Sequence, residues 1–225
     1  MMQFTIYNFV LYVHIISGFL GLLCGTIAIM KTNFIKTHKK AGKIFFYAMV
    51  FIFITSTIMC FLKTNVFLLL VGFFSFYLAC TGYRALQLKA IYKNNLKPQF
   101  IDYAISITGI LAGISIYILA YFLFIQGSNF GFVCVMLGSV SLFLGILDIR
   151  KFYIIITDKF FWMRAHAIRM AGAYAATVTA FIVVNVQINQ GWTLWILPSF
   201  IIIPIAFRII NRKVNNLQNV IKPII

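Results

Sequence analysis

Seven apolar segments, each near the length that an α-helix needs to cross a lipid bilayer, constrain this chain more than any other feature. A helix rises about 1.5 Å per residue, so about 20 residues span the hydrocarbon core. We therefore predict an all-α integral membrane bundle of seven transmembrane helices that forms one domain over residues 1–225. The predicted spans cover residues 4–30, 44–62, 66–86, 104–125, 130–148, 168–187 and 193–210.

The composition is typical of a protein embedded in a lipid bilayer and not of a soluble protein. Hydrophobic residues make up 63% of the chain and charged residues only 10%, whereas about a quarter of a typical soluble domain is charged. The net charge of +16 would suggest nucleic acid in a soluble protein. Here the basic residues flank apolar runs and no soluble basic domain is present, so we expect the lipid bilayer and no nucleic acid as partner.

The basic residues also predict the orientation. Of the 19 lysines and arginines, 18 fall in the first, third and fifth connections and the C-terminal tail, and only Lys63 lies on the other side. Basic residues are retained on the cytoplasmic side of membranes. We therefore predict an N-terminus outside, a C-terminus in the cytoplasm, and a multi-pass protein of the cell membrane, here a bacterial inner membrane.

His14 is the first of three histidines and lies within the first span. An ionisable group at membrane depth is costly and marks a functional candidate. The alternative is a neutral imidazole that hydrogen-bonds across helices, for which Thr177 and Thr179 are the expected partners.

A stripe of small residues shares the helical face of His14 and consists of Gly18, Gly21 and Gly25. Small residues let helices approach closely in membranes. We expect this face to meet protein, either within the chain or in a homo- or hetero-oligomer formed through the stripe.

The other two histidines both belong to the predicted cytoplasmic end. His38 is expected in the first cytoplasmic loop, and His166 just before the sixth span, where Arg169 lies one turn further on the same face. Two histidines at similar depth could ligate a metal or a haem iron, or contact lipid or quinone headgroups. We take His14, His38, His166 and Arg169 as candidate cofactor-binding residues, with haem b as a candidate group and the identity of any metal open.

The chain has three acidic residues, Asp102, Asp148 and Asp158, all near the cytoplasmic face. We expect Asp148 to pair with Arg164 or Arg169, and an interfacial ion-pair network with Asp148 and Asp158 is the alternative to a cofactor site at the histidines. A proton relay requires carboxylates deeper in the membrane, so the positions of the acidic residues do not favour proton-coupled transport.

Several short motifs resemble those of a bacterial family of predicted polytopic membrane proteins of unknown function. They are HKKAGK at residues 38–43, TGYR at 81–84 and RAHAIRM at 164–170, together with His14 and the glycines that follow it. The resemblance implies the seven-helix topology and points to the three histidines, but it implies no reaction.

These observations leave three hypotheses for function. The first is a non-enzymatic membrane protein, either an accessory or assembly factor or a small-ligand binder, because no catalytic motif is found. The second is a haem- or metal-binding redox protein that uses the histidines, although three histidines cannot supply the two pairs that a two-haem conduit requires. The third is a small transporter, which Pro198 and Pro204 in the last span would suit.

Overall fold

The computed structural model describes residues 2–63, 65–91, 97–186 and 191–221, and these residues form helices without any β-strand. Among these residues, seven helices are long and apolar enough to cross a membrane, which confirms the predicted all-helical fold and the predicted number of such helices. The α-helices are α1 (Met2–Met30), α2 (Ile35–Leu62), α3 (Val66–Ala85), α4 (Phe100–Ile125), α5 (Gly131–Arg150), α6 (Phe161–Asn185) and α7 (Leu197–Ile221). Two short 3-10 helices, η1 (Lys89–Ile91) and η2 (Gly191–Trp195), lie in the connections.

Four helix ends extend four or more residues beyond the predicted spans. Helices α2, α4 and α6 begin nine, four and seven residues before the predicted spans 44–62, 104–125 and 168–187, and α7 continues well past residue 210. Hydropathy marks only the part of a helix that lies in hydrocarbon, whereas intrahelical hydrogen bonding continues into the headgroup zone where lysine and arginine favour helix. The first turn predicted for the last span, residues 193–195, belongs to η2 instead. The predicted end of the sixth span at residue 187 falls outside the described residues.

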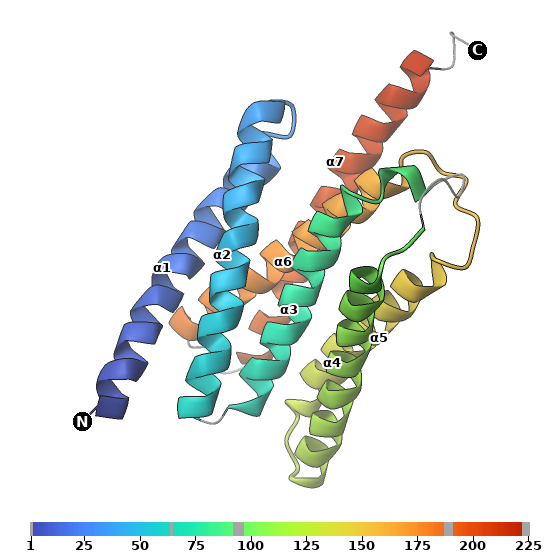
Figure 1. Ribbon diagram of the computed structural model, residues 1–225. Helices are drawn as coiled ribbons and strands as arrows, with labels where there is room; N and C mark the ends of the chain where they lie inside the picture. The colour runs from blue at the N-terminus through green and yellow to red at the C-terminus, as the bar shows by residue number, and fades with distance from the viewer. Residues whose placement is uncertain (1, 64, 92–96, 187–190, 222–225) are drawn as a thin grey trace.

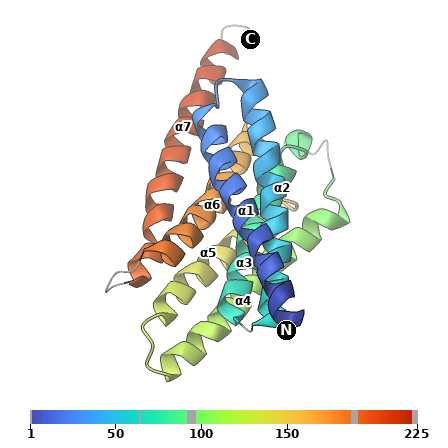
Figure 2. The same ribbon diagram turned by 90° about the vertical axis from the view of Figure 1, so that its left-hand side faces the viewer.

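The helices form two hairpins on either side of a central pair (Figure 1). Helices α1 and α2 pack along each other, as do α4 and α5, while α3 and α6 lie between the hairpins and contact each other. Helix α7 packs along α6, as Figure 2 shows from the side. The two chain termini lie at opposite ends of the bundle.

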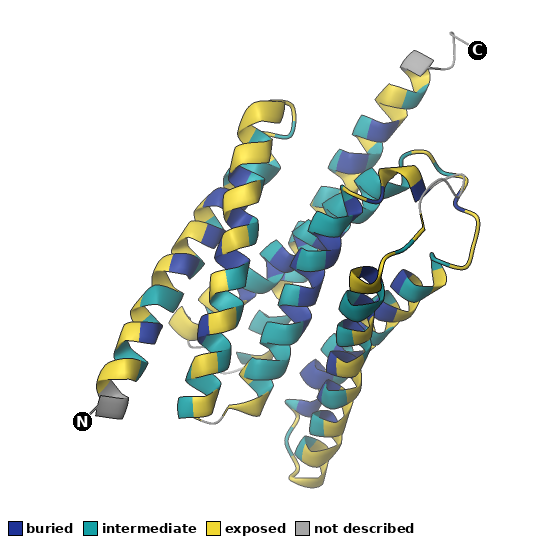
Figure 3. Cartoon of the chain, viewed as in Figure 1, coloured by how far each residue is buried: buried dark blue, intermediate teal, exposed yellow. Residues whose placement is uncertain are grey.

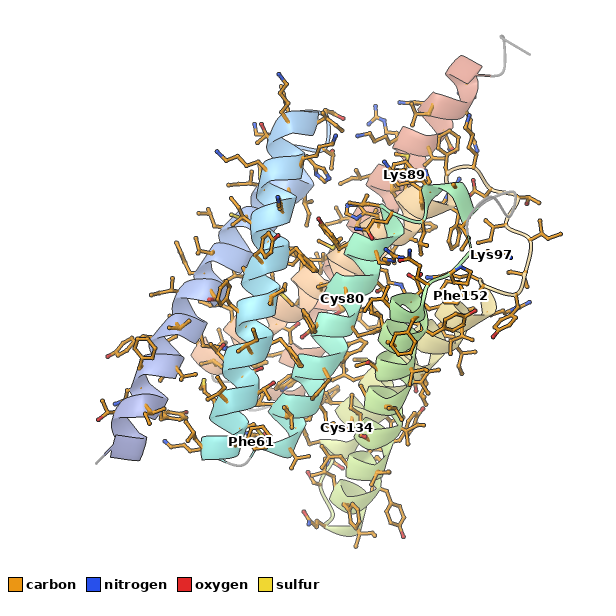
Figure 4. The ribbon with its side chains drawn as sticks, viewed as in Figure 1. Phe61, Cys80, Lys89, Lys97, Cys134 and Phe152 are labelled. Atoms are coloured by element: carbon orange, nitrogen blue, oxygen red, sulfur yellow. The ribbon has the colours of Figure 1, made fainter. Side chains whose placement is uncertain are left out.

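We call the end that carries the connections after α1, α3 and α5, together with the C-terminal end of α7, the basic end. Lys89 and Lys97 lie there, and Phe61 lies at the opposite end (Figure 4). His38 and His166 also lie at the basic end, because each is near the start of a helix, α2 or α6, that begins there.

Buried residues concentrate on the inward faces of the helices, and the outward faces are apolar and exposed (Figure 3). The exposed faces suit lipid, which replaces water around them. Glycines set the close contacts inside: a Cβ on Gly109 would lie 2.7 Å from the Tyr77 ring, and one on Gly113 would lie 2.9 Å from a backbone atom of α5. Pro204 lies within α7, which continues past it to Ile221.

Candidate functional site

His38 lies in the first turn and a half of α2, not in a loop as the sequence predicts. The connection from α1 occupies only residues 31–34, because the lysine-rich segment that follows is helical. From this position the Nδ1 atom of His38 bonds to the carbonyl oxygen of Ala28, at 2.8 Å. Ala28 is in the last turn of α1, where carbonyl groups lack partners within their own helix. His38 therefore ties the start of α2 to the end of α1.

His166 is held in the same manner between α6 and α3. Its Nδ1 atom lies 2.8 Å from the carbonyl oxygen of Gly82, in the last turn of α3. The N–H of Leu86, which would bond to this carbonyl in a continuing helix, donates to the carbonyl oxygens of Tyr83 and Arg84. The Gly82 carbonyl can therefore accept a hydrogen bond from another helix. Each histidine thus satisfies a carbonyl at the C-terminal end of a neighbouring helix.

Gly82 allows this contact because it has no side chain. A Cβ there would lie 2.8 Å from the Sδ atom of Met170 and 3.1 Å from the Cβ of Arg169, both on α6. Real Cβ atoms do not come within 3.0 Å of a neighbour, so a larger residue would require the Met170 side chain to move or α6 to shift away from α3. The TGYR motif and the RAHAIRM motif are therefore two sides of one helix contact.

The two imidazole rings converge at the basic end. Their centroids are 6.2 Å apart and their planes are inclined at 81°, and both side chains are half-buried. A carbonyl oxygen can only accept a hydrogen bond, so each Nδ1 must carry the hydrogen. In a neutral imidazole the lone pair then resides on Nε2, which leaves two Nε2 atoms available to bind a partner.

Arg169, the fourth candidate, is directed elsewhere. Its Nη1 donates to the hydroxyl of Tyr77 at 3.0 Å, and its Nη2 lies 3.1 Å from Oδ1 of Asp148 and 3.3 Å from the carbonyl of Leu144. The predicted pairing of Asp148 with one of the two arginines is thus confirmed for Arg169. Its guanidinium belongs to a separate buried cluster, although its Cβ helps to form the contact at Gly82.

That buried cluster joins α3, α5 and α6, and we name it the Tyr77 cluster. The Tyr77 hydroxyl donates to Oδ2 of Asp148 at 2.5 Å, and the ammonium of Lys151 lies 2.9 Å from Oδ1. Tyr77, Asp148 and Arg169 are all buried. Buried charges persist only when paired and hydrogen-bonded, so the cluster fixes the relative positions of three helices next to the histidines.

A second ion pair, which the sequence analysis did not predict, fixes α4 against α3. Arg84 forms a fork with both carboxylate oxygens of Asp102, at 2.6 and 3.0 Å. The same carboxylate accepts the backbone N–H of Gln99 at 2.7 Å, as part of a capping box at the start of α4. Asp158, by contrast, makes a more exposed pair with Arg164 at 3.3 Å.

His14 lies apart from the other two histidines. Along α1 it is 14 residues from Ala28, about 21 Å at the rise of an α-helix. Its Nδ1 bonds to Oγ1 of Thr55 on α2, at 2.9 Å. The Thr55 hydroxyl donates to its own helix, to the carbonyl of Phe51, so the imidazole is the donor. The predicted bond across helices is present, but its partner is Thr55 and not Thr177 or Thr179.

The residues that were predicted to partner His14 lie elsewhere. Thr177 donates to the carbonyl of Ala173 and to the sulfur of Met49, and the Oγ1 of Thr179 is buried without a hydrogen bond among the described residues. Helix α6 does contact α1, but the hydrogen-bond partner of His14 comes from α2.

The glycine stripe of α1 is largely used within the chain. A Cβ on Gly21 would meet Ile52 and Thr177 at 3.6 Å, and one on Gly25 would overlap the ring of Tyr174. Only Gly18 has no atom within 4 Å. Association of chains through this face stays a prediction, and Gly18 is the position of the stripe that remains open to it.

Comparison of this chain with models of protein families, with curated proteins and with solved structures finds no match.

Proposed function

We propose that the chain is a multi-pass protein of a bacterial inner membrane, with its N-terminus outside and the basic end in the cytoplasm. The asymmetry of 18 basic residues against one supports this orientation, because the positive-inside rule depends on such a bias. Reporter fusions test it. Green fluorescent protein fused after residue 225 should fluoresce and alkaline phosphatase at the same place should be inactive; the opposite pattern would contradict the orientation.

We further propose that the protein is a non-enzymatic binding protein that holds haem between His38 and His166. The observation that carries this proposal is the pair of imidazoles, 6.2 Å apart, each with Nδ1 bonded to a backbone carbonyl. Metal-bound histidines characteristically donate their second ring N–H in this way, which orients the ring and makes Nε2 a better ligand.

The distance between the rings suits one metal atom. Two imidazoles on opposite sides of a metal, with bonds of about 2.0 Å to nitrogen, have ring centres about 6 Å apart. Among the described residues, no group of three or more histidines, cysteines or acids is arranged to hold a metal ion. His38 and His166 would hold the iron of a haem, whose porphyrin would supply the remaining nitrogen ligands.

The surroundings of the pair are compatible with a large apolar group that carries acidic substituents. Gly42, one turn after His38 on α2, has no atom within 4 Å of where a Cβ would lie. Two turns beyond His38, Phe46 stacks on Tyr83 at 4.4 Å between ring centroids, next to Gly82. The many lysines of the basic end would meet the propionates of haem. A bound haem would serve electron transfer or haem delivery, rather than a reaction on a bound substrate.

Haem titration tests this proposal. Haemin added to the purified apoprotein in mild detergent should give a six-coordinate absorption spectrum that saturates at one haem per chain. His38→Ala and His166→Ala should each abolish the six-coordinate form, and His14→Leu is the matched control. If a bare ion such as Cu⁺ or Zn²⁺ binds saturably and haem does not, the histidines form a metal site but haem is not its ligand. If neither binds, the proposed site is wrong.

A further inference from the structure

A groove lies between α1 and α2, close to the basic end. The residues that line it include neither His38 nor His166. The groove has a volume of about 350 Å³. Cys24 and Ile27 of α1 line one side, and Lys36, Thr37, Lys40, Ala41 and Ile44 of α2 line the other.

The lining of the groove changes from polar to apolar with depth. Helix α2 starts at the basic end, so Lys36 and Lys40 lie at the mouth and Ile44 lies further into the membrane. Helix α1 runs the opposite way, which places Cys24 deeper than Ile27. A phospholipid has the same gradient, from a charged headgroup to apolar acyl chains.

The lysines at the mouth have no acidic side chain as a partner among the described residues. The sequence contains only three acidic residues, and all three are already paired: Asp102 with Arg84, Asp148 with Lys151 and Arg169, and Asp158 with Arg164. Lys36 and Lys40 are exposed, and neither forms an ion pair in the described part of the chain. Both ammonium groups are therefore free to bind an anion from outside the protein.

We propose that this groove binds one anionic phospholipid, with the headgroup phosphate between Lys36 and Lys40 and an acyl chain against Cys24 and Ile44. Basic pockets between helices at the cytoplasmic surface are suited to anionic headgroups, and each lysine near the surface contributes about 1 kcal/mol. The hydroxyl of Thr37 adds a neutral donor at the mouth.

The test uses the full chain, stripped of lipid in detergent, and follows its melting temperature as short-chain phosphatidylglycerol is added. Phosphatidylglycerol should raise the melting temperature in a saturable manner. Phosphatidylcholine with the same chains, and inorganic phosphate, should give little or no shift. The double variant Lys36→Gln/Lys40→Gln should bind phosphatidylglycerol about thirtyfold more weakly, which is about 2 kcal/mol.

The matched control is Lys39→Gln/Lys43→Gln, which removes the same charge from the same helix but from residues that do not line the groove. It should retain wild-type affinity, whereas Ile44→Trp, which fills the groove and leaves every charge in place, should weaken binding. An equal loss in both lysine doubles would show diffuse attraction and overturn the proposal. So would an equal response to phosphatidylcholine or to inorganic phosphate.

Discussion

The imidazoles of His38 on α2 and His166 on α6 form an edge-to-face pair, with their ring centroids 6.2 Å apart. Each ring is fixed by a 2.8 Å bond from Nδ1 to a carbonyl at the end of another helix, Ala28 for one and Gly82 for the other. Four helices therefore determine where the two Nε2 atoms lie. A site that is organised in this way before its ligand arrives loses little entropy on binding.

The contact at Gly82 should be sensitive to a single added carbon. Gly82→Ala places a Cβ 2.8 Å from Sδ of Met170 and 3.1 Å from Cβ of Arg169, so Met170 must move and α6 must give way at Arg169, which lengthens the bond to His166. We expect a loss of about 1–3 kcal/mol in stability together with weaker haem binding, measured by unfolding in mixed detergent and by haem titration. Gly18→Ala, at a glycine with no atom within 4 Å, is the control and should change neither quantity appreciably. Equal effects of the two substitutions would contradict the proposed contact.

The two aspartates of the α5–α6 region should differ greatly in their contribution to stability. Asp148→Asn leaves Arg169 and Lys151 without their carboxylate in a buried setting, and we expect a loss of about 3–5 kcal/mol. Asp158→Asn removes an exposed pair, in which the side chains of Arg164 and Asp158 are 37% and 40% accessible, and should cost at most about 1 kcal/mol. Unfolding of both variants under one set of conditions measures the difference. A tolerated Asp148→Asn would show that the Tyr77 cluster does not hold the helices together.

The fork between Arg84 and Asp102 should not tolerate lysine. Lysine keeps the charge but cannot contact both carboxylate oxygens and the side chain of Gln99 at once. We expect Arg84→Lys to cost about 1–2 kcal/mol, measured by the same unfolding assay. Arg150→Lys, at the exposed last residue of α5, is the control and should be neutral. A neutral result for Arg84→Lys would mean that charge alone suffices at this position.

His14 should prove to be a packing residue. His14→Leu removes the bond to Thr55 and should cost about 1 kcal/mol in stability, the typical value for a hydrogen bond between membrane helices. Haem binding should remain at the wild-type level, since His14 lies about 21 Å along α1 from the residue that holds His38. Loss of haem from this variant would place His14 in the site and contradict the two-histidine account.

The sequence predicted the helices well because apolar length is a direct consequence of bilayer thickness. It did not predict where they end in the headgroup zone, which is why His38 was expected in a loop although it lies in α2. The lysines around His38 are compatible with a helix and with a solvated loop. Hydropathy cannot distinguish these two conformations, because both are polar.

The contacts between helices were less accessible to sequence reasoning. The histidines at the basic end could be singled out because they are rare and close to helix ends. Tyr77 could not, because it is one of 11 tyrosines and its role depends on where α5 and α6 cross α3. Thr55 was overlooked for the same reason, since the face that α2 turns toward His14 follows from helix packing and not from local pattern.

A reduced-minus-oxidised absorption spectrum tests the central claim most directly. The full chain is expressed with ample haem supply and purified in mild detergent, alongside His38→Ala, His166→Ala and His14→Leu. The account predicts a six-coordinate haem signal at near-stoichiometric yield in the wild type and in His14→Leu, and its loss in the other two variants. Wild-type protein without a haem signal, or a signal that survives in both His38→Ala and His166→Ala, would contradict it.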